Sequence, residues 1–415
     1  MAEPSPAAGG SEGAARVAIA GAYGFIVLGL TDSVLGVAWP SIRQTFGLPL
    51  GMLSVLLFAA ALGYLLTAIP SGHFLNRFGA PVTMMTASLA AGVACALYAG
   101  SPAFAVLPVA SLMLGSASGS VDAGLNTVVA NGQSVRMLNF IHGAYGVGTV
   151  LGPILVTIAI AASGSWRVPY RVLIATEIIC CAGWWAVRHA IDAGRPDRTA
   201  AAGSEDAAAG SGAGLWTGGF VERFLVTAAV VVPFLYTGTE LSVGQWAASY
   251  LREQMHATPA RAGLAVAAYW GAYSAVRLLM ALPTRQINAR LIMPVGCVVA
   301  LAGALVVWLL PTLAGSVAGF VIIGAGFAPV FPALISLTPL RLGRERARYV
   351  IGWQMAAAGA GGLGIAALTG VLLGQLGLLA LGPIIVVLVL LVIASNFLMD
   401  VLAKRHQAEL GLERT

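Results

Sequence analysis

Five ionisable side chains lie inside long apolar segments of the chain: Asp32, Asp122, Glu177, Glu240 and Arg277. A charge in hydrocarbon is costly, so ionisable groups at such positions are functional candidates. Desolvation disfavours the charged form of a carboxyl, and a carboxyl there can therefore bind and release a proton. The sequence predicts proton-binding chemistry at Asp32, Asp122 and Glu240, with Arg277 as a candidate countercharge.

Asp122 has a polar neighbour on its own helical face. Asn126 follows it by four residues, a spacing that places two side chains on one side of a helix. A carboxyl and an amide on one face can bind hydroxyl groups of a ligand. The alternative is an interhelical hydrogen bond with no ligand. Asp32 lies nearer the outer end of its segment and is expected to be a further coupling carboxylate.

A second polar group surrounds Glu240. Tyr236 lies one turn earlier on the same face, and Gln245 and Trp246 follow. An aromatic ring, an amide and a carboxyl together resemble a sugar-binding surface. Arg277 is expected either to neutralise one of the buried carboxylates or to extend toward the aqueous boundary.

Weaker candidates complete the set. His142 titrates near neutral pH and is a candidate for proton coupling, with simple packing as the alternative. Glu177 is expected to form a structural ion pair with the nearby Arg167 or Arg171. The remaining candidate substrate contacts are polar and aromatic side chains of two other segments: Tyr145, Trp353 and Gln354.

Signatures of soluble enzymes are weak. Residues 359–364 match GxGxxG, but they follow no strand and lie in an apolar segment. HExxH is absent from the sequence, and GxSxG occurs only at residues 9–13, in the polar N-terminal tail, where no nucleophile elbow is expected. The cysteines all fall in apolar segments without metal-ligand spacing: Cys95, Cys180, Cys181 and Cys297. We therefore expect no enzymatic activity, no cofactor, no bound metal and no disulfide framework.

The composition explains where these residues must lie. The chain has 415 residues, of which 59% are hydrophobic and only 9% are charged. A soluble domain carries roughly a quarter charged residues, so most of this surface is expected to face lipid. The net charge of +6 does not indicate nucleic-acid binding, because the basic residues are scattered between apolar segments.

Twelve segments are apolar over about 20 residues, the length needed to span a membrane. The sequence predicts an all-α membrane protein with spans at 17–39, 51–73, 81–100, 104–130, 138–162, 168–190, 221–250, 260–283, 291–310, 314–338, 348–374 and 378–400.

The spans fall into two halves separated by a linker. An Ala/Gly/Ser/Asp-rich stretch is predicted to be flexible and divides the spans six plus six. The acidic start and the long first apolar run favour a span over a cleaved signal peptide. The expected divisions are a polar tail at 1–16, helical halves at 17–190 and 220–400, a cytoplasmic linker at 191–219 and a cytoplasmic tail at 401–415.

The basic residues predict the orientation. Of the 22 basic residues, sixteen fall on the side of the two termini and Arg277 lies within a span. Cytoplasmic loops are enriched in Lys and Arg, so both termini are expected in the cytoplasm. The five on the opposite side are Arg43, Arg167, Arg171, Arg252 and Arg261.

The two halves share glycine-rich segments. Residues 143–153 in the fifth span and 352–364 in the eleventh are both rich in glycine. Glycine-interrupted segments at matching positions indicate a transport pathway at the interface of two repeats. Close helix packing through small residues is the compatible alternative.

The stretch Ser71–Gly79, with the sequence SGHFLNRFG, resembles the signature loop of the major facilitator superfamily. Asn76 stands where that loop usually has aspartate, which weakens the expected charge relay but keeps the Gly and Arg positions. The resemblance implies two pseudo-symmetric six-helix halves that alternate access to a central site.

More specific motifs resemble the fucose/glucose–proton symporter branch of that superfamily. In the fourth-span motif Asp122 stands where the family often has glutamate, and Thr127 replaces a proline. The branch's first-span acid maps to Asp32, although the spacing to Pro40 differs. The matching segments are Val121–Asn126, His142–Gly143 with Gly152–Pro153, Tyr236–Glu240, Gly244–Trp246, Phe327–Pro339 and Gly352–Gln354.

We therefore expect a monomeric inner-membrane carrier that couples protons to symport of a small neutral solute, a monosaccharide, with sodium as the other coupling ion left open. The alternative is a proton antiporter that exports a drug or metabolite, which predicts a larger, more apolar cavity. A membrane enzyme needs a catalytic constellation that the sequence lacks. A sensor is expected to carry a sizeable soluble domain, and none is evident.

Overall fold

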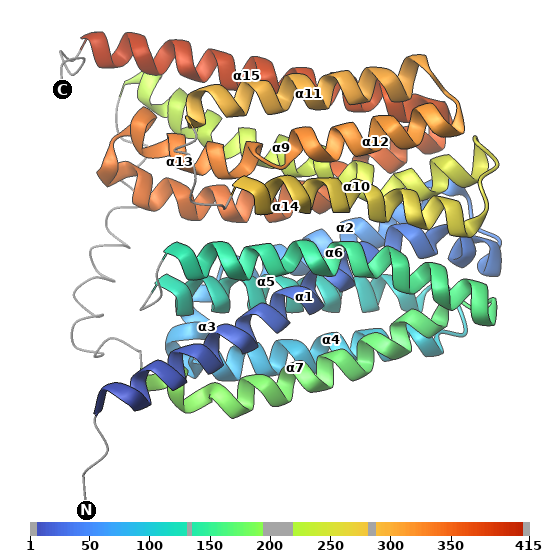
Figure 1. The fold of residues 1–415 in the computed structure, drawn as a ribbon, viewed down its shortest axis with the longest axis horizontal. Coiled ribbons are helices and arrows are strands. Elements are labelled where there is room, and N and C mark those ends of the chain that lie inside the picture. The colour runs from blue at the N-terminus through green and yellow to red at the C-terminus, as the bar shows by residue number, and fades with distance from the viewer. Residues whose placement is uncertain (1–5, 131–134, 194–218, 281–287, 410–415) are drawn as a thin grey trace, which may run out of the picture. The chain divides into compact units, whose positions relative to one another are not determined.

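The computed structural model describes residues 6–130, 135–193, 219–280 and 288–409. The described chain is helical almost throughout, as its continuous apolar segments predict (Figure 1). Residue contacts divide it into two compact units. The first unit comprises Met1–Arg195 with His256–Gly271, and the second comprises Pro196–Met255 with Ala272–Thr415.

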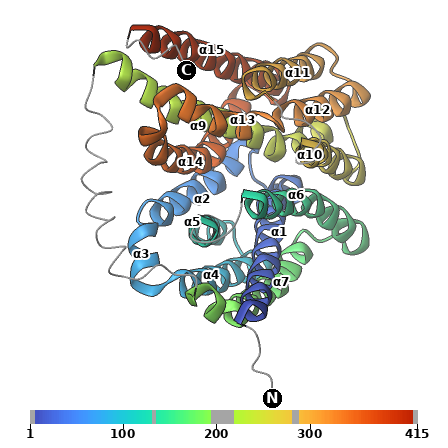
Figure 2. The same cartoon turned by 60° about the vertical axis from the view of Figure 1, so that its left-hand side comes forward.

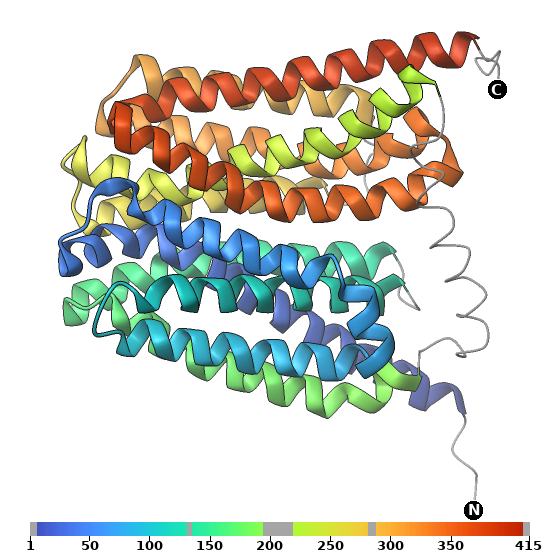
Figure 3. The same cartoon turned by 180° about the vertical axis from the view of Figure 1, so that it is seen from behind.

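The first unit is a bundle of long helices. α1 packs against α6, α2 against α5, and α4 against both α5 and α7. Figure 3 shows α2 and α5 side by side. Its helices are α1 (Pro6–Phe46), α2 (Leu53–Ala68), α3 (Ser71–Phe78), α4 (Ala80–Gly100), α5 (Val106–Ala130), α6 (Val135–Ser163), α7 (Arg167–Ala193) and the first part of α10 (Pro259–Met280).

The second unit is a bundle of the same kind. α9 is its central helix and packs against α14, α15, α13 and α12, and α11 packs against α12 and α15. Figure 3 shows α15 beside α9. Its helices are α9 (Phe220–Glu253), the second part of α10, α11 (Ala289–Leu309), α12 (Leu313–Phe327), α13 (Val330–Leu342), α14 (Arg344–Leu376) and α15 (Leu381–Glu409).

The helices have the length and composition of membrane spans. Among the described residues, eleven helical segments are long and apolar enough to cross a bilayer. The expected span at 260–283 is the helix α10, which is not among the eleven and carries Arg261 and Arg277. Every expected span coincides with a helix or with a pair of consecutive helices. The chain is therefore a multi-pass membrane protein.

Helix boundaries differ from the expected ones where proline or a terminus is involved. The second span ends at Ala68 instead of residue 73, because Pro70 interrupts the helix. The tenth span is split into α12 and α13 around Pro329. Helix α1 begins at Pro6, inside the segment expected to be a polar tail, and α15 continues to Glu409.

The signature segment 71–79 forms a short helix of its own. Figure 2 shows α3 between α2 and α4. Leu75 is buried and anchors α3, whereas Asn76 and Arg77 are exposed. The helix ends at Gly79, whose φ of 82° lies in a region that side chains rarely adopt. Glycine is therefore required where the chain turns into α4.

Glycines bring α1 and α6 into backbone contact. A side chain at Gly29 would collide with the carbonyl oxygen of Tyr145, and one at Gly148 would collide with that of Ile26. In the second unit, a side chain at Gly361 would meet the backbone of Phe234 in the same way. Gly148 and Gly361 therefore serve close helix packing, one of the two compatible roles expected for these segments.

Gly148→Leu is expected to destabilise the first unit. The new side chain must displace the α1 backbone at Ile26, and overpacking of this kind costs about 1–3 kcal/mol. The matched control is Gly183→Leu, because nothing lies within 4 Å of a Cβ added there. Thermal unfolding of the purified variants in detergent should show a lowered midpoint for Gly148→Leu only. Equal midpoints would contradict the packing role.

Candidate functional site

Asp122 on α5 is the centre of a hydrogen-bonded cluster in the first unit. The Tyr64 hydroxyl on α2 donates to Asp122 Oδ2 at 2.9 Å, and the Asn126 amide donates to Asp122 Oδ1 at 3.2 Å. Gly119, one turn before Asp122, lets α2 approach, because a Cβ there would lie 2.7 Å from the Tyr64 carbonyl oxygen. Asp122 and Asn126 share a face, as their spacing predicted.

Asp32 on α1 forms a second carboxyl site in the same unit. The Tyr145 hydroxyl on α6 donates to Asp32 Oδ2 at 3.1 Å. The close backbone approach at Gly29 and Gly148 brings these two helices together at this level. Tyr145, expected to contact substrate, is therefore placed as a hydrogen-bond donor to a carboxylate.

The two carboxyl sites influence each other. Asp32 and Asp122 lie within range of mutual electrostatic repulsion, and Tyr64 lies near both of them. Like charges in one site disfavour the doubly ionised state. In the described part of the chain, no ion pair joins Asp122 to an Arg, Lys or His side chain.

Glu240 on α9 is the centre of a charged cluster in the second unit. It is 5% exposed and interacts electrostatically with Arg277 on α10. The Arg277 guanidinium lies 4.3 Å from the centre of the Tyr273 ring, within cation–π range. The Tyr236 hydroxyl donates to the Phe327 carbonyl at 2.8 Å and is fully buried. Arg277 is therefore placed as the countercharge of Glu240.

The proline break between α12 and α13 gives Arg277 its anchoring carbonyl. Pro332 has no N–H group, so the carbonyl of Ala328, four residues earlier, has no helical donor. Arg277 Nε donates to this oxygen at 3.1 Å. Pro332 thus leaves an acceptor at the junction of α12 and α13, and Arg277 donates to it.

Other candidate substrate contacts are placed in packing surfaces. The Trp246 indole is fully buried and donates to Ala366 at 2.8 Å, which joins α9 to α14. Gln354 bonds to Thr338 and donates to the Ala229 carbonyl at 2.9 Å, which joins α14 to α13 and α9. These side chains hold helices together and do not line a site with Glu240.

Of the three further candidates, two can be described by their exposure. Gln245 is buried. Trp353 is 51% exposed and lies on a different side of α14 from its buried neighbour Gln354. The side chain of His142 lies outside the described residues.

The prediction that Glu177 forms an ion pair with Arg167 or Arg171 is wrong for the described structure. Arg167 instead donates to the Ser101 carbonyl at 2.9 Å and stacks on Trp166, and Arg171 is exposed. The spacing of six residues from Arg171 to Glu177 places the two side chains on different faces of α7.

Two partners of the carboxyl sites were not among the sequence candidates. Tyr64 is a single tyrosine in the second span, and no sequence spacing relates it to Asp122, which lies 58 residues away on another helix. Tyr273 precedes Arg277 by four residues and stacks on it, a spacing that could have identified it. Among the described residues, no cluster of three or more His, Cys, Asp or Glu side chains could hold a metal ion.

Comparison with known proteins agrees with this architecture. The chain is 24% identical over 319 residues to membrane protein MosC of Rhizobium meliloti, covering 76% of this chain and 74% of MosC. The fold matches the crystal structure of a D-xylose–proton symporter with a TM-score of 0.72 at 13% identity, covering 91% of this chain and 96% of the symporter. Residues 22–367 match the Major Facilitator Superfamily. The chain therefore belongs to the major facilitator superfamily, a family of membrane transporters.

Proposed function

We propose that the protein is a proton-coupled secondary transporter that moves a small neutral solute, a monosaccharide, by alternating access. The observation that carries this proposal is the Asp122 cluster. Its carboxyl lies in a membrane span and is bonded to Tyr64 and Asn126, which are both neutral. Neutral partners leave the carboxyl free to change its charge by taking up a proton, which proton coupling requires.

The buried cations of the second unit support a neutral solute. Arg277 is already engaged by Glu240, Tyr273 and Ala328. An anionic solute needs its charge compensated once water is removed.

Arg341, also in the described second unit, is buried. It pairs with Asp400 at 2.8 Å and donates to Asn396 at 2.7 Å. Neither arginine can bind an anion without giving up an existing partner.

The solute class rests on two further supports. The Asp122–Asn126 face offers donors and acceptors, which hydroxyl-rich ligands require. The protein with the matching fold is a symporter of D-xylose and protons. The distribution of basic residues supports cytoplasmic termini for the proposed carrier. We also propose that it lies in the inner membrane and acts as a monomer in contact with lipid.

The test is uptake of radiolabelled hexoses and pentoses into proteoliposomes. With an inward proton gradient, we expect accumulation of at least one sugar that disappears when the gradient is collapsed by an ionophore. Replacing Na⁺ by choline should leave accumulation unchanged, because protons are the proposed coupling ion. Lipophilic cations serve as competitors in the same assay.

Two results would count against the proposal. Binding of lipophilic cations without binding of any sugar favours the exporter. Sugar uptake that follows a Na⁺ gradient and ignores the proton gradient retains the solute class but rejects the coupling ion.

A further inference from the structure

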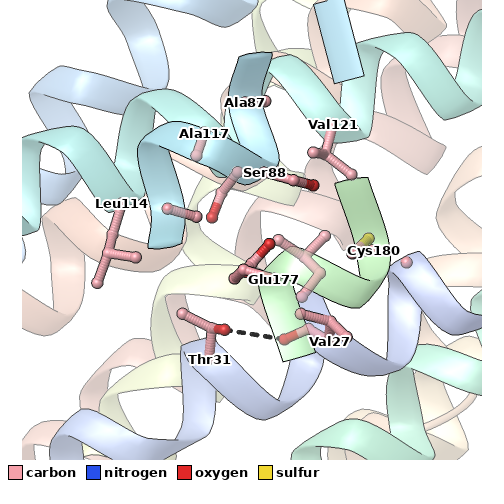
Figure 4. Close-up of a pocket in the computed structure, with 13 residues that line it drawn as sticks. Val27, Thr31, Ala87, Ser88, Leu114, Ala117, Val121, Glu177 and Cys180 are labelled. Carbon is pink, nitrogen blue, oxygen red and sulfur yellow. Dashed lines mark hydrogen bonds between the residues drawn. The ribbon is translucent and has the colours of Figure 1, made fainter. Parts of the chain in front are cut away.

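Glu177 lies outside the sites used by the proposed function. It is on α7, is only 6% exposed, and lines a small cavity of about 20 Å³ among α1, α4, α5 and α7 (Figure 4). Gly92 on α4 packs beside it, and a Cβ added there would make an ordinary van der Waals contact with the Glu177 Cβ at 3.7 Å.

A second polar group faces the same cavity. Ser88 on α4 is 1% exposed, and its hydroxyl lies close to Glu177 and Cys180 without a hydrogen bond of good geometry in the described structure. Figure 4 shows the Ser88 side chain and the Glu177 carboxyl directed toward the same space. The hydroxyls of Thr31 and Ser118 also belong to the lining, although Thr31 already donates to Val27. A buried hydroxyl whose hydrogen bonds are poorly formed is costly, and a water molecule in this space would satisfy it.

The charge of Glu177 has no compensating cation in the described residues. No ion pair joins it to Arg, Lys or His. The titratable groups whose charges it influences are Tyr23 on α1, Cys95 on α4, and Cys180 and Cys181 on its own helix. None of these is a cation at neutral pH. An isolated buried carboxylate is strongly disfavoured, so the group needs either a proton or a bound cation.

The size of the cavity indicates what could occupy it beside the Glu177 carboxyl. A cavity needs roughly 10–15 Å³ to hold one water molecule, and that water needs two to four polar partners. The volume of about 20 Å³ therefore suits one water, with Glu177 and Ser88 as its partners.

We propose that Glu177 and Ser88 form a binding site for one proton together with one water molecule. The site is distinct from the carboxyl pair of the proposed coupling machinery. Thr31 and Val121 line the cavity, but their sequence neighbours Asp32 and Asp122 do not. This inference is independent of the transported solute and of the direction of transport.

Infrared difference spectroscopy of the purified protein tests the proposal. At neutral pH, the wild-type spectrum minus that of Glu177→Gln should contain a protonated-carboxyl C=O band. The band should shift in D₂O, because the cavity water allows exchange. Ser88→Ala removes one partner of the water and should shift the band without abolishing it. Asp192→Asn, at an exposed carboxylate on the same helix, should leave it unchanged.

Three results would overturn the proposal. Absence of the band from the difference spectrum shows that Glu177 is ionised. A band that disappears on addition of Na⁺ shows a sodium site in place of a proton site. A band that is identical in Ser88→Ala excludes the shared water. If Glu177→Gln does not yield folded protein, the Ser88→Ala and Na⁺ comparisons on wild type decide the question.

Discussion

Asp122→Asn is expected to abolish uphill accumulation of solute while sparing exchange of solute across the membrane. Asparagine keeps the shape of the side chain and can still accept from Asn126, while its NH2 group can donate to the Tyr64 hydroxyl, but it cannot gain or lose a proton. The carrier can then still alternate between its two states with solute bound, yet the proton gradient no longer drives net movement. Accumulation and exchange are therefore expected to separate in this variant.

The expected effect is large. A membrane potential of about 100 mV supplies about 2.3 kcal/mol for each charge moved, which corresponds to roughly 50-fold accumulation. In Asp122→Asn this accumulation should fall to equal concentrations on both sides. The measurement is radiolabelled sugar in proteoliposomes, once with a proton gradient and once as counterflow against preloaded unlabelled sugar.

Two further variants control the experiment. Asp192→Asn removes an exposed carboxylate and should accumulate solute like wild type. Tyr64→Phe removes a hydrogen bond to Asp122 but keeps the titrating carboxyl, so it should retain accumulation with an altered pH dependence. Full proton-driven accumulation by Asp122→Asn would show that the coupling proton is carried elsewhere.

The sequence predicts the spans well, because length and apolarity alone decide whether a segment can cross a bilayer. It predicts less well where the backbone is interrupted inside an apolar run. The 314–338 segment has the hydropathy of one span, yet Pro329 splits it into α12 and α13. Residues 71–78 form the helix α3, although the family resemblance indicated a loop there and residues 71–73 were expected to end the second span.

The candidate site was predicted only where one helix determines the geometry. The four-residue spacing placed Asn126 beside Asp122, and helix geometry fixes this contact without knowledge of the fold. Tyr64 was missed because it comes from another helix, 58 residues away. Gln354 and Trp246 were expected to contact solute, but the packing of α9, α13 and α14 directs them into the bundle. Which face a helix turns to its neighbours depends on all of them, and residue types do not decide it.

Arg277→Ala is expected to be the most destabilising change in the second unit. Arg277 provides the positive charge beside Glu240, makes a cation–π contact with the Tyr273 ring and donates a hydrogen bond to the Ala328 carbonyl. Removing one partner of a buried pair typically costs about 3–5 kcal/mol, because the other charge stays buried and uncompensated. Thermal unfolding should show a lowered midpoint. The control, Arg261→Ala, alters an exposed arginine on the same helix and should have little effect.

The conservative variant separates charge from geometry. Arg277→Lys keeps the positive charge but lacks the planar guanidinium that can stack on Tyr273 and donate to Ala328 at the same time. It should therefore recover only part of the stability that Arg277→Ala loses. Recovery to the wild-type midpoint would mean that charge alone matters at this position.

A double-mutant cycle with Glu240→Gln tests whether the arginine acts on the carboxylate. If the main role of Arg277 is to compensate Glu240, then Arg277→Ala should cost much less in the Glu240→Gln background, since no buried charge remains. The residual cost then measures the Ala328 carbonyl left without a donor, about 1–3 kcal/mol. Equal costs of Arg277→Ala in both backgrounds would show that Arg277 anchors the proline break between α12 and α13 and does not serve Glu240.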